Sequence, residues 1–303
     1  MSILNKNNKN IIRSTVYDGL ETVDSIFGSS GLFTEVTIKD TKSGEILYNN
    51  HNTTVLGGRV AQLEELFGIL RNSDQHVLLN SPEVLNIEHS ETNTVLNSQT
   101  IRRKTSWFMV GNGATPDNQV GKYVSPKNYE TRLYSPIPFR LVPLSSDLSQ
   151  IEQSKYRLRR IETHDGVDYA AYYAKAFNPG SVILEHNSST YIPNQLHTEP
   201  IGENDISTYV PGGSVLAYIQ FTLDIDENEI KEFFRVTRGD LTSCNMSEIG
   251  LVMGADLPNA SDISGNNRSE LAAAEMVSKI TSASVDLSQE GSSRQVTYRI
   301  YAK

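Results

Sequence analysis

The sequence predicts an α+β fold that is mostly β, with antiparallel, sandwich-like sheets and two amphipathic helices near the N-terminus. Three observations support this fold class. Short segments that alternate apolar and polar residues recur through the second half of the chain. Glycine-containing turn sequences separate them. Two segments near the N-terminus instead place apolar residues at helical spacing.

We expect three regions along the 303-residue chain. Residues 1–13 are rich in Asn and Lys and form an N-terminal arm; residues 14–140 form an α+β region with two helices and a hairpin; residues 141–303 form a mostly β domain that ends in a C-terminal strand. Prolines near the boundary, at Pro136 and Pro138, favour extended and irregular backbone there.

The helices are expected at about 14–27 and 57–70. The apolar residues of the first are Val16, Leu20, Val23 and Phe27. Those of the second are Val60, Leu63, Phe67 and Leu70. Gly57 and Gly58 open the second helix, and its paired carboxylates, Glu64 and Glu65, lie on the polar face as solvating groups.

The expected strands include two hairpins. One covers about 33–55 with its turn at Gly44, and the other covers about 155–177 with an Asp-Gly turn. Further strands are expected at "TSWFMVG", "GSVLAYIQFTLDI", "EIKEFFRVT", "MSEIGLVMG", "AAAEMVSKITSASVDL" and "RQVTYRIYAK". The segment "SELAAAEM" stays open between strand and helix, because Leu and Ala favour helices.

Composition limits the function classes. The formal net charge is −9, whereas nucleic-acid binders usually carry a basic excess or stripe. The one basic cluster, Lys155 with Arg157, Arg159 and Arg160, is interpreted as the exposed side of a strand. Cys244 is the only cysteine, so an intrachain disulfide is excluded, and we interpret it as a small buried residue. No signal peptide or membrane-spanning apolar run is present, so we expect a soluble protein made in the cytosol.

The sequence "VGNGATP" is a partial dinucleotide-binding motif. The third glycine of G-x-G-x-x-G is missing, and Pro116 stands where a helix should open. We therefore interpret Gly111 and Gly113 as turn residues that adopt positive φ.

The sequence "DIDENEIKEFFR" begins like a calcium-binding loop, at Asp224, Asp226 and Asn228. The sixth position is Glu229, where an EF-hand needs Gly, and the twelfth is Arg235, where it needs Glu. A solvated acidic turn is the stronger interpretation.

Histidines and nucleophile motifs give no catalytic constellation. The six histidines, none in a compact metal-ligand spacing, are His51, His76, His89, His164, His186 and His197. There is no G-x-S-x-G sequence. We assign no catalytic, cofactor-binding or metal-binding residue, expect no cofactor, and predict that the protein is not an enzyme.

Two groups of segments resemble tailed-bacteriophage virion proteins. "EIGLVMG" at 248–254, "LAAAEMVSKI" at 271–280 and "RQVTYRIYAK" resemble the C-terminal strands of those proteins, and "TTVLGGRVAQLEELFG" followed by "WFMVGNGATP" resembles their first half. The chain departs from the pattern at "LAAAEMV", where those proteins read an "LFAR"-like sequence. The middle, about 120–210, resembles nothing we can name.

The resemblance implies a structural protein of the phage virion, from the tail, baseplate or neck. Such a protein is made in the host cytoplasm and assembles symmetrically with copies of itself and with other virion proteins, without catalysis, nucleic-acid contact or membrane contact. The loop from Asp256 to Arg268 would face a neighbour.

Two alternatives remain open from the sequence. One is a receptor- or glycan-binding module that contacts a host surface glycan, which exposed rings at Tyr123, Tyr129 and Tyr134 would favour. The other is a tail-associated glycan hydrolase, which needs two carboxylates at catalytic separation.

Overall fold

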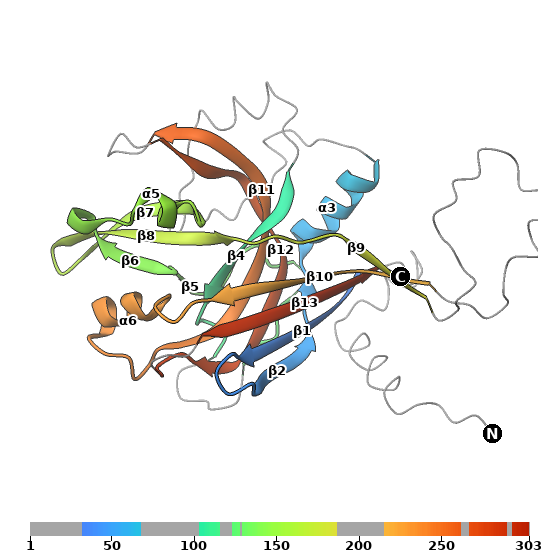
Figure 1. The fold of residues 1–303 in the computed structure, drawn as a ribbon, viewed down its shortest axis with the longest axis horizontal. Helices are drawn as coiled ribbons and strands as arrows, with labels where there is room; N and C mark the ends of the chain where they lie inside the picture. The colour runs from blue at the N-terminus through green and yellow to red at the C-terminus, as the bar shows by residue number, and fades with distance from the viewer. Residues whose placement is uncertain are drawn as a thin grey trace, which may run out of the picture. The chain divides into compact units, whose positions relative to one another are not determined.

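The computed structural model describes residues 32–67, 103–115, 123–127, 129–186, 215–261, 267–289 and 293–302. Strands dominate these residues and form antiparallel sheets (Figure 1). The chain divides into two compact units. The described residues of the smaller unit are 32–34, 180–186, 215–221 and 298–302, and the rest belong to the larger unit.

One sheet has five strands in the order β2-β1-β13-β10-β9. Their bounds are β1 Leu32–Asp40, β2 Ile46–His51, β13 Arg294–Ala302, β10 Val215–Ile225 and β9 Val182–His186. The first predicted hairpin is confirmed, because β1 and β2 pair antiparallel and Gly44, with φ of 75°, lies in the turn between them. The strands predicted at "GSVLAYIQFTLDI" and "RQVTYRIYAK" are also confirmed as β10 and β13.

The other sheet has eight strands, and it includes the two longest strands among the described residues, β11 and β12. Its main order is β3-β12-β11-β4-β8-β6, with β5 paired to β4 and β7 paired to β8. Their bounds are β3 Thr53–Thr54, β12 Asn267–Asp286, β11 Asn245–Ser261, β4 Lys104–Gly111, β8 Val167–Ala176, β6 Arg140–Pro143, β5 Pro136–Ile137 and β7 Tyr156–His164. β4 precedes residue 140, where the sequence predicts a boundary between two regions, and its neighbours β11 and β8 follow that residue. This sheet therefore pairs strands from both sides of the predicted boundary.

The β7–β8 hairpin forms as the Asp-Gly turn predicts. Its ladder runs from Tyr156↔Lys175 to His164↔Val167. Asp165 and Gly166 both adopt positive φ, at 50° and 77°. This conformation matches the right-handed twist of the flanking strands, and Asp and Gly tolerate it well.

A helix, α3, covers Leu56–Phe67 in the segment of the second predicted helix; the first lies outside the described residues. The apolar face predicted for α3 is wrong at Leu63, which is 56% exposed. The helix contacts β12 through its glycines instead. A Cβ built on Gly58 would lie 2.1 Å from the Val277 carbonyl oxygen, and one built on Gly57 would lie 2.4 Å from that of Met276. Only glycine permits this close backbone approach.

The segment "EIKEFFRVT" was predicted as a strand, and the prediction is wrong. It forms helix α6, Lys231–Arg238, which ends at Gly239 in the left-handed conformation, with the Gly239 amide bonded to the Arg235 carbonyl. Phe234, a residue of this helix, is fully buried. The glycine after a basic last turn is a helix-end signal that outweighed the apparent alternation.

The C-terminal hairpin settles one alternative that the sequence left open and corrects one expectation. "SELAAAEM" is strand, as part of β12, because long-range pairing with β11 decides a segment whose local preference is helical. Of the stretch from Asp256 to Arg268, expected to be a loop, residues 256–261 and 267–268 continue the ladder, with Asp256 paired to Leu271 and Ser261 paired to Asn267, and residues 262–266 lie outside the described residues.

The core of the larger unit lies on the eight-stranded sheet. One apolar cluster joins residues of β4, β8, β11 and β12. Trp107, Met109, Tyr173, Val252 and Met276 are buried members of it. Among the described residues of the smaller unit, Phe221 stacks on Tyr298 with ring centroids 5.2 Å apart.

Candidate functional site

The glycine-rich turn after β4 and the segment at Tyr134 and Ser135 together hold a carboxylate of the chain itself. The amides of Gly113 and Ser135 donate to Oε1 of Glu248, at 2.7 and 3.1 Å, and the amide of Tyr134 donates to Oε2 at 2.7 Å. Backbone amides that converge in a turn form an anion site. Here a glutamate from β11 fills it, where a dinucleotide motif would hold a phosphate.

The glycines of this turn are needed for space. Neither Gly111 nor Gly113 is among the positive-φ residues, so that part of the interpretation is wrong. A Cβ on Gly113 would lie 2.7 Å from the Ser135 amide nitrogen and 2.9 Å from Glu248 Oε1. A Cβ on Gly111 would lie 2.5 Å from the Ser135 carbonyl oxygen. The turn and the segment around Ser135 therefore pack backbone against backbone.

A buried lysine completes this carboxylate site. Lys279 on β12 is fully buried, and its Nζ lies 3.2 Å from Glu248 Oε2 and 2.9 Å from Glu130 Oε2. It also donates to the Arg132 carbonyl, and it lies 3.2 Å from the ring centroid of Tyr134. The ammonium thus has two carboxylates, a carbonyl and an aromatic face as partners, which offset the cost of its burial.

The acidic turn before α6 also holds a cation of the chain. Nζ of Lys175, on β8, donates to the Asp224 carbonyl at 2.8 Å and to Glu229 Oε2 at 2.8 Å, and lies 3.3 Å from Asp226 Oδ2. The Asp226 amide donates to the same Glu229 oxygen, which closes the turn. The calcium-like oxygens therefore surround an ammonium group, and the predicted solvated turn is wrong at Glu229, which is buried.

A tyrosine extends this second cluster into the core. The Tyr156 hydroxyl donates to Glu229 Oε1 at 2.5 Å. Burial, and then the charge of Glu229, raises the pKa of Tyr156 well above its ordinary value, so the hydroxyl stays a donor. The turn ends at Ile230, which has φ of 72°, a conformation that is rare for a β-branched residue, and whose amide donates to the Phe139 carbonyl at 2.7 Å.

Two arginines of the basic cluster, Arg157 and Arg159 on β7, are engaged in ion pairs. Arg159 was predicted to be exposed but is buried, with Nη2 2.6 Å from Asp147 Oδ2 and Nε donating to the Tyr172 hydroxyl. Arg157 Nε lies 2.9 Å from Asp256 Oδ1 on β11. These guanidinium groups fix the position of β7 through carboxylates of the chain.

The single cysteine and the described histidines have structural surroundings. Burial raises the pKa of the Cys244 thiol to about 11, which keeps it protonated and unreactive at neutral pH. His164 is half-buried, with Nε2 3.2 Å from Glu162 Oε2, and its ring meets the edge of Tyr169. His51 ends β2 and is half-buried; the side chains of the other four lie outside the described residues.

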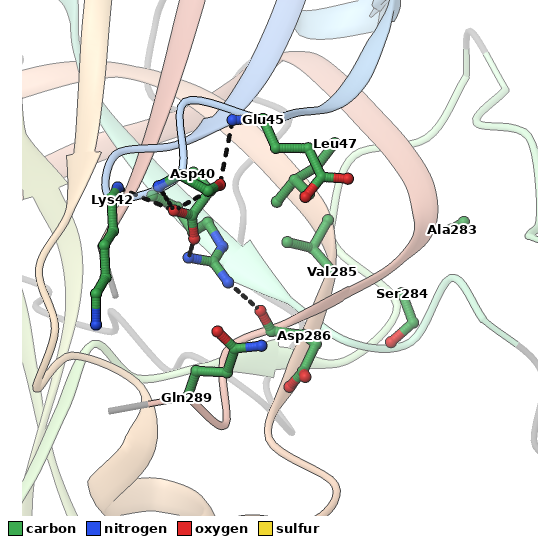
Figure 2. Close-up of a pocket in the computed structure, with 11 residues that line it drawn as sticks. Asp40, Lys42, Glu45, Leu47, Ala283, Ser284, Val285, Asp286 and Gln289 are labelled. Atoms are coloured by element: carbon green, nitrogen blue, oxygen red, sulfur yellow. Dashed lines mark hydrogen bonds and ion pairs between the residues drawn. The ribbon is translucent and has the colours of Figure 1, made fainter. Parts of the chain in front are cut away.

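A pocket of ≈ 560 Å³ lies between the β1–β2 turn and the end of β12 (Figure 2). An ion pair lines it: Asp40 on β1 is paired with Arg294 on β13, and Arg294 Nη2 donates to the Asp286 carbonyl. The hydrogen bond from the Ser43 backbone amide is the main cause that holds the pKa of Asp40 below its ordinary range, and the Ser43 hydroxyl also contributes. The Asp40 carboxylate is therefore ionised at neutral pH, whereas a glycosidase general acid requires a raised pKa.

The three tyrosines named in the sequence analysis differ in their exposure and in their contacts. Tyr129 is 65% exposed, Tyr123 37% and Tyr134 41%. Tyr134 is engaged, because its ring covers Lys279 and its hydroxyl donates to Glu130. Tyr129 presents the most accessible of the three rings.

Sequence reasoning missed both lysine clusters. The signal of the Lys279 cluster is a charged residue beside or inside an apolar run that is expected to be buried: Glu248 precedes "IGLVM", and Lys279 lies in "MVSKI". A buried charge requires a partner of opposite sign. That rule predicts a pair but does not say which of the chain's many carboxylates provides it.

Metal-binding groups and long apolar helices are both absent from the part of the chain that the structure describes. Within these residues, no three or more His, Cys, Asp or Glu side chains are grouped so as to hold a metal ion. Within the same residues, no helix has the length and apolar character needed to cross a membrane.

Comparison with known proteins identifies a family and gives no further match. No curated protein matches the chain, and no solved structure matches it. Residues 49–300, which include the glycine-rich turn, the acidic turn and both buried lysines, match a family described only as a family of unknown function. Because the match covers most of the chain, the protein belongs to this family, DUF7208.

Proposed function

We propose that this chain is a structural component of a tailed-bacteriophage particle, of the tail, baseplate or neck. It acts by symmetric assembly with copies of itself and with other virion proteins, without catalysis. It is made in the host cytoplasm and ends in the virion. The proposal includes a sandwich-like packing of the two sheets, for which the Tyr48 hydroxyl on β2, 3.3 Å from the Thr281 carbonyl on β12, is one supporting contact.

The observation that supports the proposal most is the meeting of the segments that carry the phage resemblance. "WFMVG" forms β4 and pairs with "EIGLVMG" in β11, with Gly111 opposite Glu248. "TTVLGGR" supplies β3 and the start of α3, which contact "MVSKI" in β12. Segments far apart in the sequence thus form one continuous structure, as expected if they belong to one ancestral scaffold.

The test of this function is the composition of the particle. Particles of the virus that encodes the chain would be purified, and the chain would be quantified by mass spectrometry and located by immunogold labelling. We expect many copies at a defined place on the particle. A chain that is abundant in infected cells and missing from purified particles would contradict the proposal.

A second candidate is a glycan-binding module on the same particle, and the exposure of Tyr129 is what favours it. An accessible aromatic ring stacks on the apolar face of a sugar. Lys127 Nζ lies 5.8 Å from the Tyr129 ring centroid, so the ring also has a cation beside it.

This candidate is tested on a glycan array with the wild-type chain, Tyr129→Ala and a control outside the tyrosine group, Ile151→Ala, since Ile151 is 81% exposed. The glycan-binding function predicts a signal that Tyr129→Ala removes. Equal signals for wild type and Tyr129→Ala, or no signal from any glycan, would contradict it.

A further inference from the structure

Two turns frame the pocket of Figure 2, and both belong to the larger unit. The first turn, residues 40–45, joins β1 to β2, and the second, residues 286–289, lies at the end of β12. Figure 2 shows Glu45 and Leu47 on one side of the Asp40 carboxylate, with Asp286 and Gln289 on the other. We call the hollow between the two turns the turn pocket.

A buried carboxylate holds the first turn. Oδ1 of Asp40 accepts hydrogen bonds from the backbone amides of Lys42 and Ser43, at 2.9 and 2.7 Å. Oδ2 of the same carboxylate pairs with Arg294. The bonds to the two amides fix the backbone of the turn, as an aspartate at the start of a turn commonly does.

Two buried cations hold the second turn. Arg294 is 4% exposed, and its Nη2 donates to the Asp286 carbonyl at 2.6 Å. Lys231, the first residue of α6, is 3% exposed, and its Nζ donates to the Gln289 carbonyl at 2.7 Å. Each cation bonds to the backbone of a residue that lines the turn pocket. Both walls are therefore positioned before any ligand is present.

Lys231 differs from Lys175 and Lys279 in its partners. Those two lysines each contact two carboxylates, whereas Lys231 has no carboxylate within ion-pair distance among the described residues. A buried ammonium group with a single carbonyl partner costs folding free energy. The wall of the turn pocket, which this hydrogen bond positions, gives the residue a role other than stability.

The lining of the turn pocket carries both signs of charge. Asp40 and Arg294 neutralise each other, which leaves Lys42 together with Glu45 and Asp286. None of these last three side chains takes part in an ion pair within the described residues. A small anion would meet the two carboxylates and a small cation would meet the lysine. A neutral hydroxyl group suits both, because it donates and accepts hydrogen bonds.

We propose that the turn pocket binds a neutral, hydroxyl-rich ligand, namely a sugar residue of a glycan. The volume of ≈ 560 Å³ lies within the range of small-molecule sites, about 300–1,000 Å³. Leu47 and Val285 offer apolar surface to the C–H face of a sugar ring. The Arg294 Nε is buried and has no hydrogen-bond partner within the described residues, and a sugar oxygen would supply one. Walls that are already fixed lower the entropy lost on binding.

The test is saturation-transfer difference NMR of the full chain with glucose, galactose, mannose, N-acetylglucosamine, lactose and maltose, each at about 5 mM. We expect at least one sugar to bind, with a Kd on the order of a millimolar, as is usual for so small a ligand. Ser284→Trp fills the pocket from an exposed position and should abolish the signal. The matched control is Ser145→Trp, which changes an exposed serine that does not line the pocket. Circular dichroism verifies that both variants are folded.

A second comparison tests the class of ligand. Asp286→Asn keeps the shape of the pocket and removes one charged acceptor, so we expect the affinity for the sugar to fall roughly three- to tenfold. Acetate and methylammonium each carry one sign of charge and no hydroxyl group, and we expect neither to bind. Tighter binding of either ion than of every sugar would overturn the assignment of a neutral, hydroxyl-rich ligand.

This inference does not rest on the virion function or on Tyr129, and each can fail separately. Absence of binding by all six sugars, or a sugar signal that Ser284→Trp leaves unchanged, overturns the turn pocket even if the chain is abundant in particles. A signal that Tyr129→Ala removes and Ser284→Trp preserves belongs to the Tyr129 ring and overturns it too. A signal lost with Ser284→Trp alone supports the pocket, whatever the composition of the particle.

Discussion

Two buried lysines, Lys279 and Lys175, are bound in the same way at two different places in the larger unit. Each ammonium group contacts two carboxylates and one backbone carbonyl, and each lies near an aromatic ring, Tyr134 at 3.2 Å and Phe139 at 6.0 Å. Each also lies at a turn whose sequence suggests a ligand site. In both turns the chain supplies its own ion.

The two clusters differ in their access to water. Around Lys279 the carboxylate of Glu248 is fully buried and that of Glu130 is 12% exposed. Around Lys175 the carboxylate of Glu229 is buried, but that of Asp226 is 57% exposed. Water can solvate the second cluster when a partner is lost, and it has much less access to the first. The same chemistry should therefore stabilise the fold by different amounts.

The largest expected effect is that of Lys279→Met. It leaves the buried Glu248 carboxylate without its cation, and we expect a loss of about 3–5 kcal/mol in the free energy of unfolding. Urea denaturation followed by circular dichroism measures it. Adding Glu248→Gln should recover part of the loss, because the uncompensated charge is then removed.

We expect Lys175→Met to lower the free energy of unfolding by a smaller amount, about 2–3 kcal/mol, since water reaches Asp226 and screens the remaining charges. The same urea titration, on the same day and protein batch, gives the difference between the two variants. Equal losses for Lys175→Met and Lys279→Met would show that solvent access does not separate the clusters.

Gly113→Ala tests the glycine-rich side of the first cluster. The new methyl group would lie 2.7 Å from the Ser135 amide nitrogen, so the turn must move away from Glu248, at a cost of about 1–3 kcal/mol. Gly166→Ala is the contrast, because no atom lies within 4 Å of its Cβ and only its positive φ opposes the change. A smaller loss for Gly113→Ala than for Gly166→Ala in thermal unfolding would contradict the close approach.

We expect the smallest loss of stability for Asp226→Asn, about 0–1 kcal/mol in the free energy of unfolding, because an exposed carboxylate contributes little to an ion pair. Raising the salt concentration should reduce even this difference, since exposed charges are screened. Thermal unfolding of wild type and variant at low and high salt provides the measurement. A loss as large as that of Lys175→Met would mean that Asp226, and not Glu229, holds the lysine.

Local signals in the sequence predicted the elements that local chemistry decides. The turns at Gly44 and at Asp165–Gly166, and the alternation of β10, need no information from distant residues. The error at α6 has another cause, because Gly239 ends a helix there while the apparent alternation favours a strand. At β12 the sequence leaves strand and helix open, and the pairing with β11 decides for a strand.

The candidate sites show the same limit. The residue types at both turns were noticed, but their partners, Lys279 for one and Lys175 for the other, come from strands far away in the sequence. Short-range patterns identify groups that need a partner. Only the order of strands in the sheet reveals which residue meets that need.

The central place of β4 has a consequence for synthesis. Its partners β5 and β8 follow soon after it in the chain, but β11 emerges roughly 130 residues after β4, on the order of ten seconds later at ordinary translation rates. Until then, the edge carrying Trp107 and Phe108 has no neighbour on that side and can pair with another nascent chain. A lower growth temperature, or a chaperone that shields this strand, should therefore increase the yield of folded protein more than a substitution on the surface of the folded protein would.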